Sequence, residues 1–217
     1  MITTPDLGAV AAAGTPGLAA VVVLAGGGST RLGQDKTRAL VGGEAVLDRL
    51  VAGLGDVVPG VPVVVVGPSR PTARPVLWCR EEPPGGGPVA GLARGLALPV
   101  GDPPTPVPDD GLLAVLAGDL PFAAPALRPL LAAWAAAPLG TDGVLGVDAG
   151  GDDQLLVAVH RAGALRRAVA AQSGAGAVRA VVRRLSVVRA PLAWPLTLDV
   201  DTAEDLERAR ALVDRQT

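Results

Sequence analysis

Short apolar runs that alternate with segments of helical periodicity constrain the fold of this chain most. The runs are rich in valine and leucine and are apolar at nearly every position, which is typical of parallel strands buried on both faces. They predict strands at Ala20–Leu24, Val63–Gly67, Val76–Cys79, Leu112–Ala117, Gly143–Val147, Leu155–Val159 and Leu196–Asp199. Helical patterns are found at Glu44–Leu54, Val89–Leu98, Ala126–Ala136, Ala162–Ala171, Ala177–Arg184 and Ala203–Val213.

This alternation predicts one α/β domain with a single doubly wound, mostly parallel sheet flanked by helices, a Rossmann-like arrangement. We expect residues 1–17 to form a flexible leader and residues 18–217 to form the domain. The proline-rich stretch Pro99–Asp110 is interpreted as a surface loop, because strand signals lie close on both sides of it. In such a sheet, ligands bind beyond the carboxyl ends of the strands.

Composition and charge exclude several classes of protein. The net charge of −2 gives no support for binding to nucleic acid or to an anionic membrane surface. The single cysteine, Cys79, excludes an intramolecular disulfide and a cysteine-based metal cluster, and is interpreted as a buried thiol. The apolar stretch Gly8–Leu24 has no basic residue before it and is interrupted by glycine and proline, so it does not predict a membrane span. A cytoplasmic location is expected.

Lysine is nearly absent from this chain. Of 19 lysine and arginine residues, only Lys36 is a lysine. A lysine presents a compact point charge on a slim stem, which arginine cannot replace. A lone lysine in an arginine-rich chain therefore hints at a site with a geometric demand.

A glycine-rich segment follows the first predicted strand and ends at this lysine. Its glycines allow backbone N–H groups to approach phosphate oxygens closely. The segment fits neither the P-loop, since Lys36 comes two residues late, nor the dinucleotide fingerprint, which requires glycine at Arg31. Two cations beyond the glycines suit a triphosphate, although a flexible turn with solvated charges is the alternative.

The same segment resembles the signature of the molybdenum-cofactor guanylyltransferase-like family of nucleotidyltransferases. The family pattern L-A-G-G-x-S-x-R-x-G-x-D-K matches at every fixed position from Leu24 to Lys36. The resemblance implies that the loop wraps a nucleotide and that Arg31 and Lys36 act on its phosphates as catalytic cations. The nucleotide-binding residues implied in the loop are Leu24, Ala25, Gly26, Gly27, Gly28, Ser29 and Gly33.

A second block resembles the part of the family that holds the base. The acidic pair Glu81-Glu82 precedes a segment similar to the family's G-P-L-A-G block, although the family usually has aspartate at the position of Glu82. The resemblance implies that the base is held by Glu82, Gly87, Pro88 and Gly91. A plain helix-entry loop is the alternative for this segment.

Two further blocks imply a metal site. Asp119 follows a predicted strand in L-A-G-D-L-P-F, where the family aspartate holds Mg²⁺, and Mg²⁺ prefers one or two carboxylates plus substrate phosphates. The segment Leu198–Leu206 resembles the N-x-N-T-P-E-[DE]-L block, with aspartates in place of both asparagines. We assign Asp201 as the second ligand of Mg²⁺ or Mn²⁺, although it also suits a helix N-cap and Asp199 remains open. The segment Asp153–Leu156 resembles a Q-P-L block near the acceptor.

Together these blocks imply transfer of GMP from GTP to the phosphate of molybdopterin, with release of pyrophosphate. An acceptor phosphate is already anionic, so a chain with one histidine, His160, and no tyrosine meets the chemical requirement, and we interpret this histidine as structural. The Gly26-Gly27 pair matches the guanylyl branch of the family. The alternatives are another NTP transferase, acting with CTP or on a sugar or polyol phosphate, and a degenerate nucleotide-binding module. Transient contact with proteins that deliver or accept the molybdenum cofactor is also expected.

Overall fold

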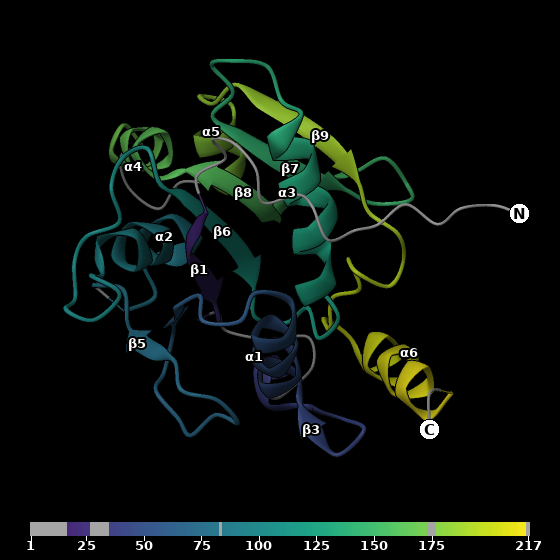
Figure 1. Cartoon of the computed structure of the whole chain (residues 1–217). Coiled ribbons are helices and arrows are strands. Elements are labelled where there is room, and N and C mark those ends of the chain that lie inside the picture. The colour runs from purple at the N-terminus through teal and green to yellow at the C-terminus, as the bar shows by residue number, and fades with distance from the viewer. Residues whose placement is uncertain (1–16, 27–34, 83, 173–176, 216–217) are drawn as a thin grey trace, which may run out of the picture.

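The computed structural model describes residues 17–26, 35–82, 84–172 and 177–215. Within these residues seven strands form one sheet in the order β5-β4-β1-β6-β8-β7-β9 (Figure 1). The strands are β1 (Leu18–Leu24), β4 (Val63–Val66), β5 (Leu77–Cys79), β6 (Leu112–Ala117), β7 (Gly143–Val147), β8 (Asp153–Arg161) and β9 (Val187–Pro191). Apart from Gly17, the predicted leader lies outside the described residues.

The sheet is mostly parallel, as the sequence predicts. β1 runs parallel to β4 and β6, β4 runs parallel to β5, and β7 runs parallel to β9. In the sheet as described, β8 alone is antiparallel to its two neighbours, β6 and β7. The prediction of a doubly wound α/β fold is confirmed.

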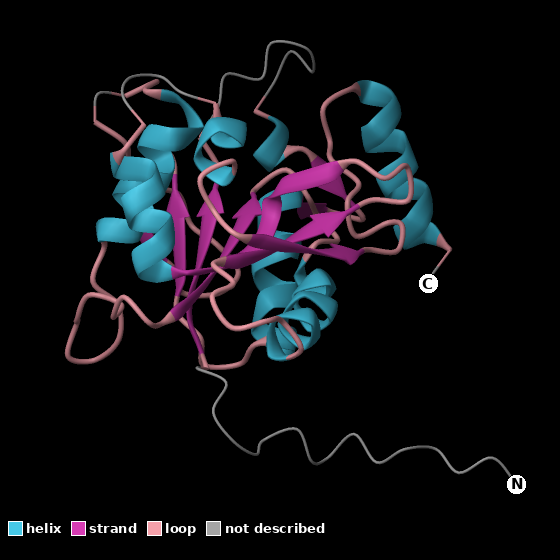
Figure 2. Cartoon of the chain, turned by 90° about the horizontal axis from the view of Figure 1, so that it is seen from above, coloured by secondary structure: helices cyan, strands magenta, loops and turns pink. Residues whose placement is uncertain are grey.

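Helices cover both faces of the sheet (Figure 2). On one face, α2 (Gly87–Ala97), α4 (Ala162–Ala170) and α5 (Val178–Val182) pack into one hydrophobic core. On the other face, α1 (Val46–Val57) and α3 (Leu127–Ala135) form a second core. In α1 the buried residues Leu47, Leu50 and Leu54 recur at helical spacing, so one side of the helix faces the sheet.

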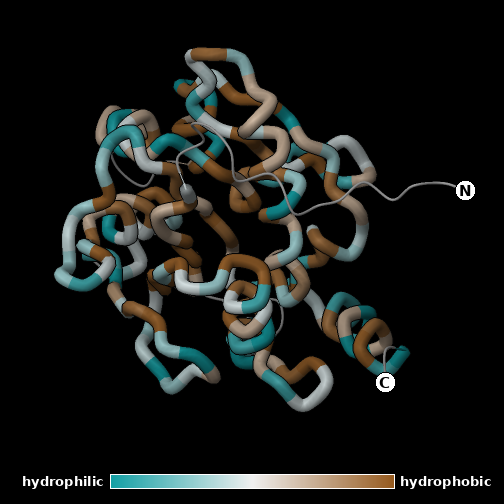
Figure 3. Tube along the Cα trace, in the orientation of Figure 1, coloured by the Kyte–Doolittle hydropathy of each residue, from teal (hydrophilic) through white to brown (hydrophobic). Residues whose placement is uncertain are grey.

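A third, smaller core joins α6 (Ala203–Asp214) to the hairpin of β2 (Leu40–Val41) and β3 (Glu44–Ala45). In Figure 3, α6 carries both hydrophobic and hydrophilic segments, as expected for a helix with one buried side. The N-cap is Thr202, whose hydroxyl accepts the N–H of Asp205 at 3.2 Å while the Asp205 carboxylate accepts the Thr202 N–H at 3.0 Å. The alternative of Asp201 as N-cap is therefore wrong.

Two element predictions are also wrong. The predicted strand Leu196–Asp199 does not form: the chain turns at residues 194–197, where the N–H groups of Leu196 and Leu198 donate to the backbone oxygens of Ala193 and Pro195 at 3.0 Å each, and then runs on without regular structure. The last strand of the described sheet is β9 instead. The helix expected from Glu44 begins at Val46, because Gly42 and Gly43 adopt φ values of +60° and +79° and close the β2–β3 hairpin.

The expected loop between α2 and β6 is present and contains the isolated bridge Val100–Thr105. Two short 3-10 helices, η1 (Lys36–Arg38) and η2 (Ala124–Ala126), complete the described elements. None of the helices in the described ranges is long and apolar enough to cross a membrane.

His160 lies in β8 and is buried in the interior, with 2% of its surface exposed. Its Nδ1 atom has no hydrogen-bond partner among the described residues. Burial lowers the pKa of His160 from 6.5 to about 4, although the nearby Asp142 acts in the opposite direction. This histidine therefore belongs to the core, in keeping with the structural interpretation.

The buried histidine predicts a loss of stability in mild acid. Its pKa is lower in the folded state, so the unfolded chain takes up the proton first, and stability falls as pH drops from 6.5 toward about 4. Between pH 7 and pH 5 this group is expected to cost about 2 kcal/mol of unfolding free energy. Urea unfolding of wild type and His160→Leu at both pH values measures the effect. An equal loss in both proteins would contradict the prediction.

Candidate active site

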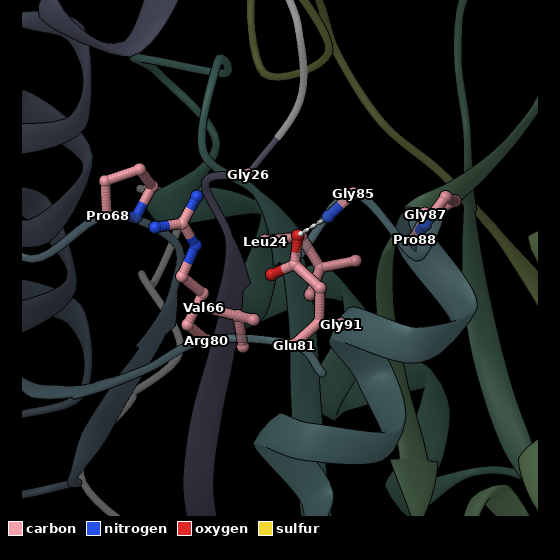
Figure 4. A pocket seen from close by; sticks show the side chains of 10 residues that line it. All are labelled: Leu24, Gly26, Val66, Pro68, Arg80, Glu81, Gly85, Gly87, Pro88 and Gly91. Atoms are coloured by element: carbon pink, nitrogen blue, oxygen red, sulfur yellow. Dashed lines mark hydrogen bonds between the residues drawn. The ribbon is translucent and has the colours of Figure 1, made fainter. Parts of the chain in front are cut away.

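The carboxyl ends of β1, β4, β5 and β6 meet at one edge of the sheet because these strands are parallel. A cavity of about 420 Å³ opens at this edge (Figure 4). It is lined by Leu24, Gly26, Val66, Pro68, Arg80, Glu81, Gly85, Gly87, Pro88 and Gly91. We call it the first cavity. The first cavity is therefore lined both by the start of the glycine-rich segment, at Leu24 and Gly26, and by the start of α2, two parts that the sequence predicted to share a nucleotide.

Glu81 supplies the carboxylate of the first cavity. One of its oxygens accepts the N–H of Gly85 at 3.1 Å, and the side chain points into the space beside Gly26 (Figure 4). Gly85 and Gly87 adopt φ values of +81° and +82°, so the turn between β5 and α2 depends on glycine. The neighbouring Glu82, which the sequence analysis selected, is exposed and does not line this cavity.

Two more cavities lie beyond the first along the same edge. The middle cavity, of about 150 Å³, is lined by Leu24, Ala25, Gly26, Lys36, Thr37, Pro88, Ala117, Asp119 and Leu156. The third cavity, of about 330 Å³, is lined by Ala117, Asp119, Leu120, Gln154, Leu155, Leu156, Val157, Val178 and Asp199. The middle cavity shares lining residues with both of the others. The three spaces are therefore neighbours in a row along the edge of the sheet.

Lys36 lies at the centre of this row and joins two carboxylates. Its ammonium group forms ion pairs with Asp119 and, at 2.7 Å, with Asp201. Burial lowers the pKa of Lys36, but hydrogen bonds to both carboxylates and their negative charges outweigh burial, so the pKa is raised above its ordinary value. The ammonium group is therefore charged at neutral pH.

Close approach of β1 and β6 positions Asp119. A Cβ atom on Gly118 would lie 3.0 Å from Ala25 Cβ and 3.1 Å from Leu24 O, so this approach requires glycine. The backbone oxygen of Asp119 accepts the N–H of Val200 at 3.1 Å. This bond holds the segment that contains Asp201 beside the end of β6, which explains how residues 82 positions apart reach the same ammonium group.

A family model described as "MobA-like NTP transferase domain" matches residues 21–189. The chain belongs to this family. The resemblance noted in the glycine-rich segment is thus confirmed at the level of the family, whose members are NTP transferases. A comparison with curated proteins finds no match.

Solved structures support the same fold for this MobA-like domain. Molybdopterin-guanine dinucleotide biosynthesis protein A from Archaeoglobus fulgidus is 20% identical, with a TM-score of 0.64 over 90% of this chain and 98% of that one. A nucleotidyl transferase from Methanothermobacter is 18% identical, with a TM-score of 0.68 over 93% and 100%. A 4-diphosphocytidyl-2C-methyl-D-erythritol synthase from Anaerococcus prevotii is 12% identical, with a TM-score of 0.61 over 91% and 99%.

The two aspartates that precede α6, Asp199 and Asp201, have different surroundings. Asp201 binds Lys36, whereas Asp199 lines the third cavity. Burial, and then the charges of Asp201 and Asp119, raise the pKa of Asp199. The geometry therefore favours Asp201 over Asp199 as the partner of Asp119.

The carboxylates of Asp119 and Asp201 fit a divalent cation together with a substrate. Both reach one ammonium group, so they lie close enough to share a single cation. No cluster of three or more His, Cys, Asp or Glu side chains suited to a metal occurs in the described residues. A carboxylate pair completed by phosphate oxygens is the arrangement that Mg²⁺ commonly adopts in nucleotide enzymes.

Some predicted site residues of this MobA-like domain lie outside the described residues. These are Gly27, Gly28, Ser29, Arg31 and Gly33, and their roles stay predictions. Conversely, no motif in the sequence predicted a role for Arg80, which lines the first cavity, or for Arg70, which contacts the segment around Lys36. Both follow the carboxyl ends of strands, where ligand-binding residues are expected, and this position is the signal that could have found them.

Proposed function

We propose that the chain transfers GMP from GTP to the phosphate of molybdopterin and releases pyrophosphate, with Mg²⁺ or Mn²⁺ as cofactor. The observation that carries this proposal is the meeting of Lys36 with Asp119 and Asp201, of which Lys36 and Asp119 line the middle cavity, between the first and the third. A nucleotide base in the first cavity and an acceptor in the third would place the reacting phosphates beside these three side chains. Membership of an NTP transferase family supports the same reaction class.

The chemistry demands charge neutralisation more than proton transfer. The acceptor phosphate oxygen attacks the α-phosphorus, the bond from the α-phosphorus to the bridging oxygen breaks, and pyrophosphate leaves with the bond electrons. Lys36, together with Arg31, would offset the charge that grows on the leaving group. Asp119 and Asp201 would hold Mg²⁺, which when bound neutralises charge on the transferred phosphate. No side chain needs to act as a strong general base.

Glu81 supports guanine as the base. The edge of guanine that carries N1–H and the N2 amino group presents two adjacent donors, and a carboxylate accepts both. The Glu81 carboxylate points into the first cavity and is oriented by the Gly85 N–H. Leu24 and Val66 provide apolar contacts in the same cavity.

The third cavity supports a heterocyclic acceptor. Leu155, Leu156 and Val157 provide apolar contacts, and Gln154 and Asp199 provide polar groups. This combination suits a flat ring system with hydrogen-bond donors, such as a pterin, better than a sugar or polyol phosphate. Proteins that deliver molybdopterin or accept the product would make transient contact near this end of the row.

Pyrophosphate release tests the proposal directly. The purified chain is incubated with Mg²⁺, molybdopterin and each of the four NTPs, and product is identified by mass spectrometry. We expect pyrophosphate and a guanine dinucleotide product with GTP. Preference for CTP or UTP would favour the alternative, another NTP transferase. Sugar and polyol phosphates are therefore also tested as acceptors, because the fold is similar to that of a diphosphocytidyl-methylerythritol synthase. If no combination of NTP and acceptor releases pyrophosphate, a degenerate nucleotide-binding module would be favoured.

Replacing Glu81 with glutamine is expected to weaken the preference for GTP. Glutamine turns one of the two acceptors into a donor, so kcat/KM for GTP should fall about 30-fold, the equivalent of one hydrogen bond to a charged group. The ratio of kcat/KM for GTP to that for CTP measures the change. Glu82→Gln is the matched comparison. If that variant, and not Glu81→Gln, loses the preference, the base contact belongs to Glu82 as the sequence analysis expected.

A further inference from the structure

Arg70 follows β4 and reaches into the segment that carries Lys36. Its Nη1 donates to the hydroxyl of Thr37 at 2.9 Å and its Nη2 donates to the Thr37 backbone oxygen at 2.7 Å. The guanidinium group also lies 3.6 Å from the carboxylate of Asp35. One side chain therefore contacts the residues on both sides of the lysine.

These contacts are partly buried and mutually supporting. The Arg70 side chain is 11% exposed, and Thr37 is 4% exposed. Thr37 donates its backbone N–H and its hydroxyl to one oxygen of Asp35, at 3.0 Å and 2.7 Å. Burial lowers the pKa of Arg70, while Asp35 opposes this effect. Arginine remains charged in proteins, so these hydrogen bonds are charge-assisted.

We propose that Arg70 is a positioning residue that fixes Lys36 for the nucleotidyl transfer step. This inference rests on the proposed function. Lysine has a long, flexible side chain, so its ammonium group reaches Asp119 and Asp201 reproducibly only if the backbone at Asp35–Thr37 is also fixed. Arg70 supplies that anchor from a different part of the sheet. Nη1 and Nη2 each donate one hydrogen bond to Thr37, so Arg70 is held against the segment of Lys36 and is placed to act through it.

The chain offers an unusually direct readout, because Lys36 is its only lysine. Incorporation of lysine labelled with ¹³C at Cε gives one side-chain NMR signal, which reports the surroundings of this ammonium group without any turnover. In the wild type we expect the shift and linewidth of a held, paired lysine. In Arg70→Ala the signal should move toward that of free lysine and become narrower.

Arg74→Ala is the matched control. Arg74 lies four residues further on and forms an exposed ion pair with Asp56 at 3.1 Å. This substitution should leave both the Lys36 signal and the activity unchanged. Circular dichroism and thermal unfolding verify that each variant is folded. Arg70→Gln, which adds no second lysine signal and cannot form the same two-pronged contact, serves if Arg70→Ala does not fold, and should shift the signal in the same direction.

Enzyme kinetics provide a second, independent test of the role of Arg70. Arg70→Ala should lower kcat about 10- to 100-fold, as expected for a displaced reacting group, with less than a threefold change in KM for the acceptor. When Lys36 is already replaced by alanine, adding Arg70→Ala should lower kcat by less than twofold. An unchanged Lys36 signal in folded Arg70→Ala, or a full effect in the Lys36→Ala background, would overturn the inference. If the wild type releases no pyrophosphate, the proposed function fails, while the NMR arm still decides the role of Arg70.

Discussion

Lys36→Ala is expected to lower kcat for pyrophosphate release at least about 100-fold, the usual cost of removing one charge-stabilising contact in a transition state. The ammonium group lies between the first and third cavities and is held by two carboxylates, so it is placed to meet the phosphates of a bound NTP. Negative charge grows on the pyrophosphate only as the bond breaks. The loss should therefore appear mainly in kcat, with a smaller effect on KM for GTP.

A coupled pyrophosphate assay under saturating GTP and acceptor measures this loss. Arg38→Ala is the control, because Arg38 lies two residues away in the same short helix and its side chain is 60% exposed. That variant removes one positive charge from the region, but Arg38 lines none of the three cavities. Turnover of Lys36→Ala within threefold of the wild type would remove Lys36 from the mechanism.

The second large effect is expected for Asp119→Ala, which should also lower kcat at least about 100-fold. Asp119 lines both the middle and the third cavity and pairs with Lys36, so its loss affects the proposed cation site and the lysine together. Titration of Mg²⁺ at fixed GTP should require a higher concentration for half-maximal activity in this variant. Asp119→Asn, which keeps the shape of the side chain, should show the same direction of change.

Asp110→Asn is the control for Asp119, since Asp110 precedes the opposite end of β6 and is exposed. It should change neither kcat nor the Mg²⁺ requirement. If Asp119→Ala keeps near-wild-type turnover and the same Mg²⁺ midpoint, the carboxylate pair does not serve the cation. The proposed chemistry would then have to be abandoned.

The sequence predicted much of the sheet, because buried strands are apolar at every position whatever their neighbours. The same uniformity hides the direction of a strand, which explains why the reversed direction of β8 was not predicted. It also explains the error at Leu196–Asp199. That segment and β9 are both short and apolar, and only long-range pairing with β7 selects Val187–Pro191 as the strand.

The candidate site was predictable where a local pattern specifies it. The motif around Lys36 and the aspartate after a hydrophobic strand both identified residues that the structure brings together. The choice between Glu81 and Glu82 depends on the direction of a side chain just after a strand ends, where the alternation of the strand no longer applies. Arg70 acts through contacts 33 residues away, and no local pattern reveals such contacts.

The third core has a consequence for how the molecule matures during synthesis. Leu198, Val200 and Leu206 pack with Ala39 and Val41. The segment next to Lys36 therefore packs against residues that are synthesised after every strand of the described sheet. A ribosome-bound chain that ends before Leu198 would hold every strand of the described sheet, but its lysine would lack Asp201, one of its two carboxylate partners. Competence for the reaction would thus arise as a late, separate event that follows folding of the scaffold.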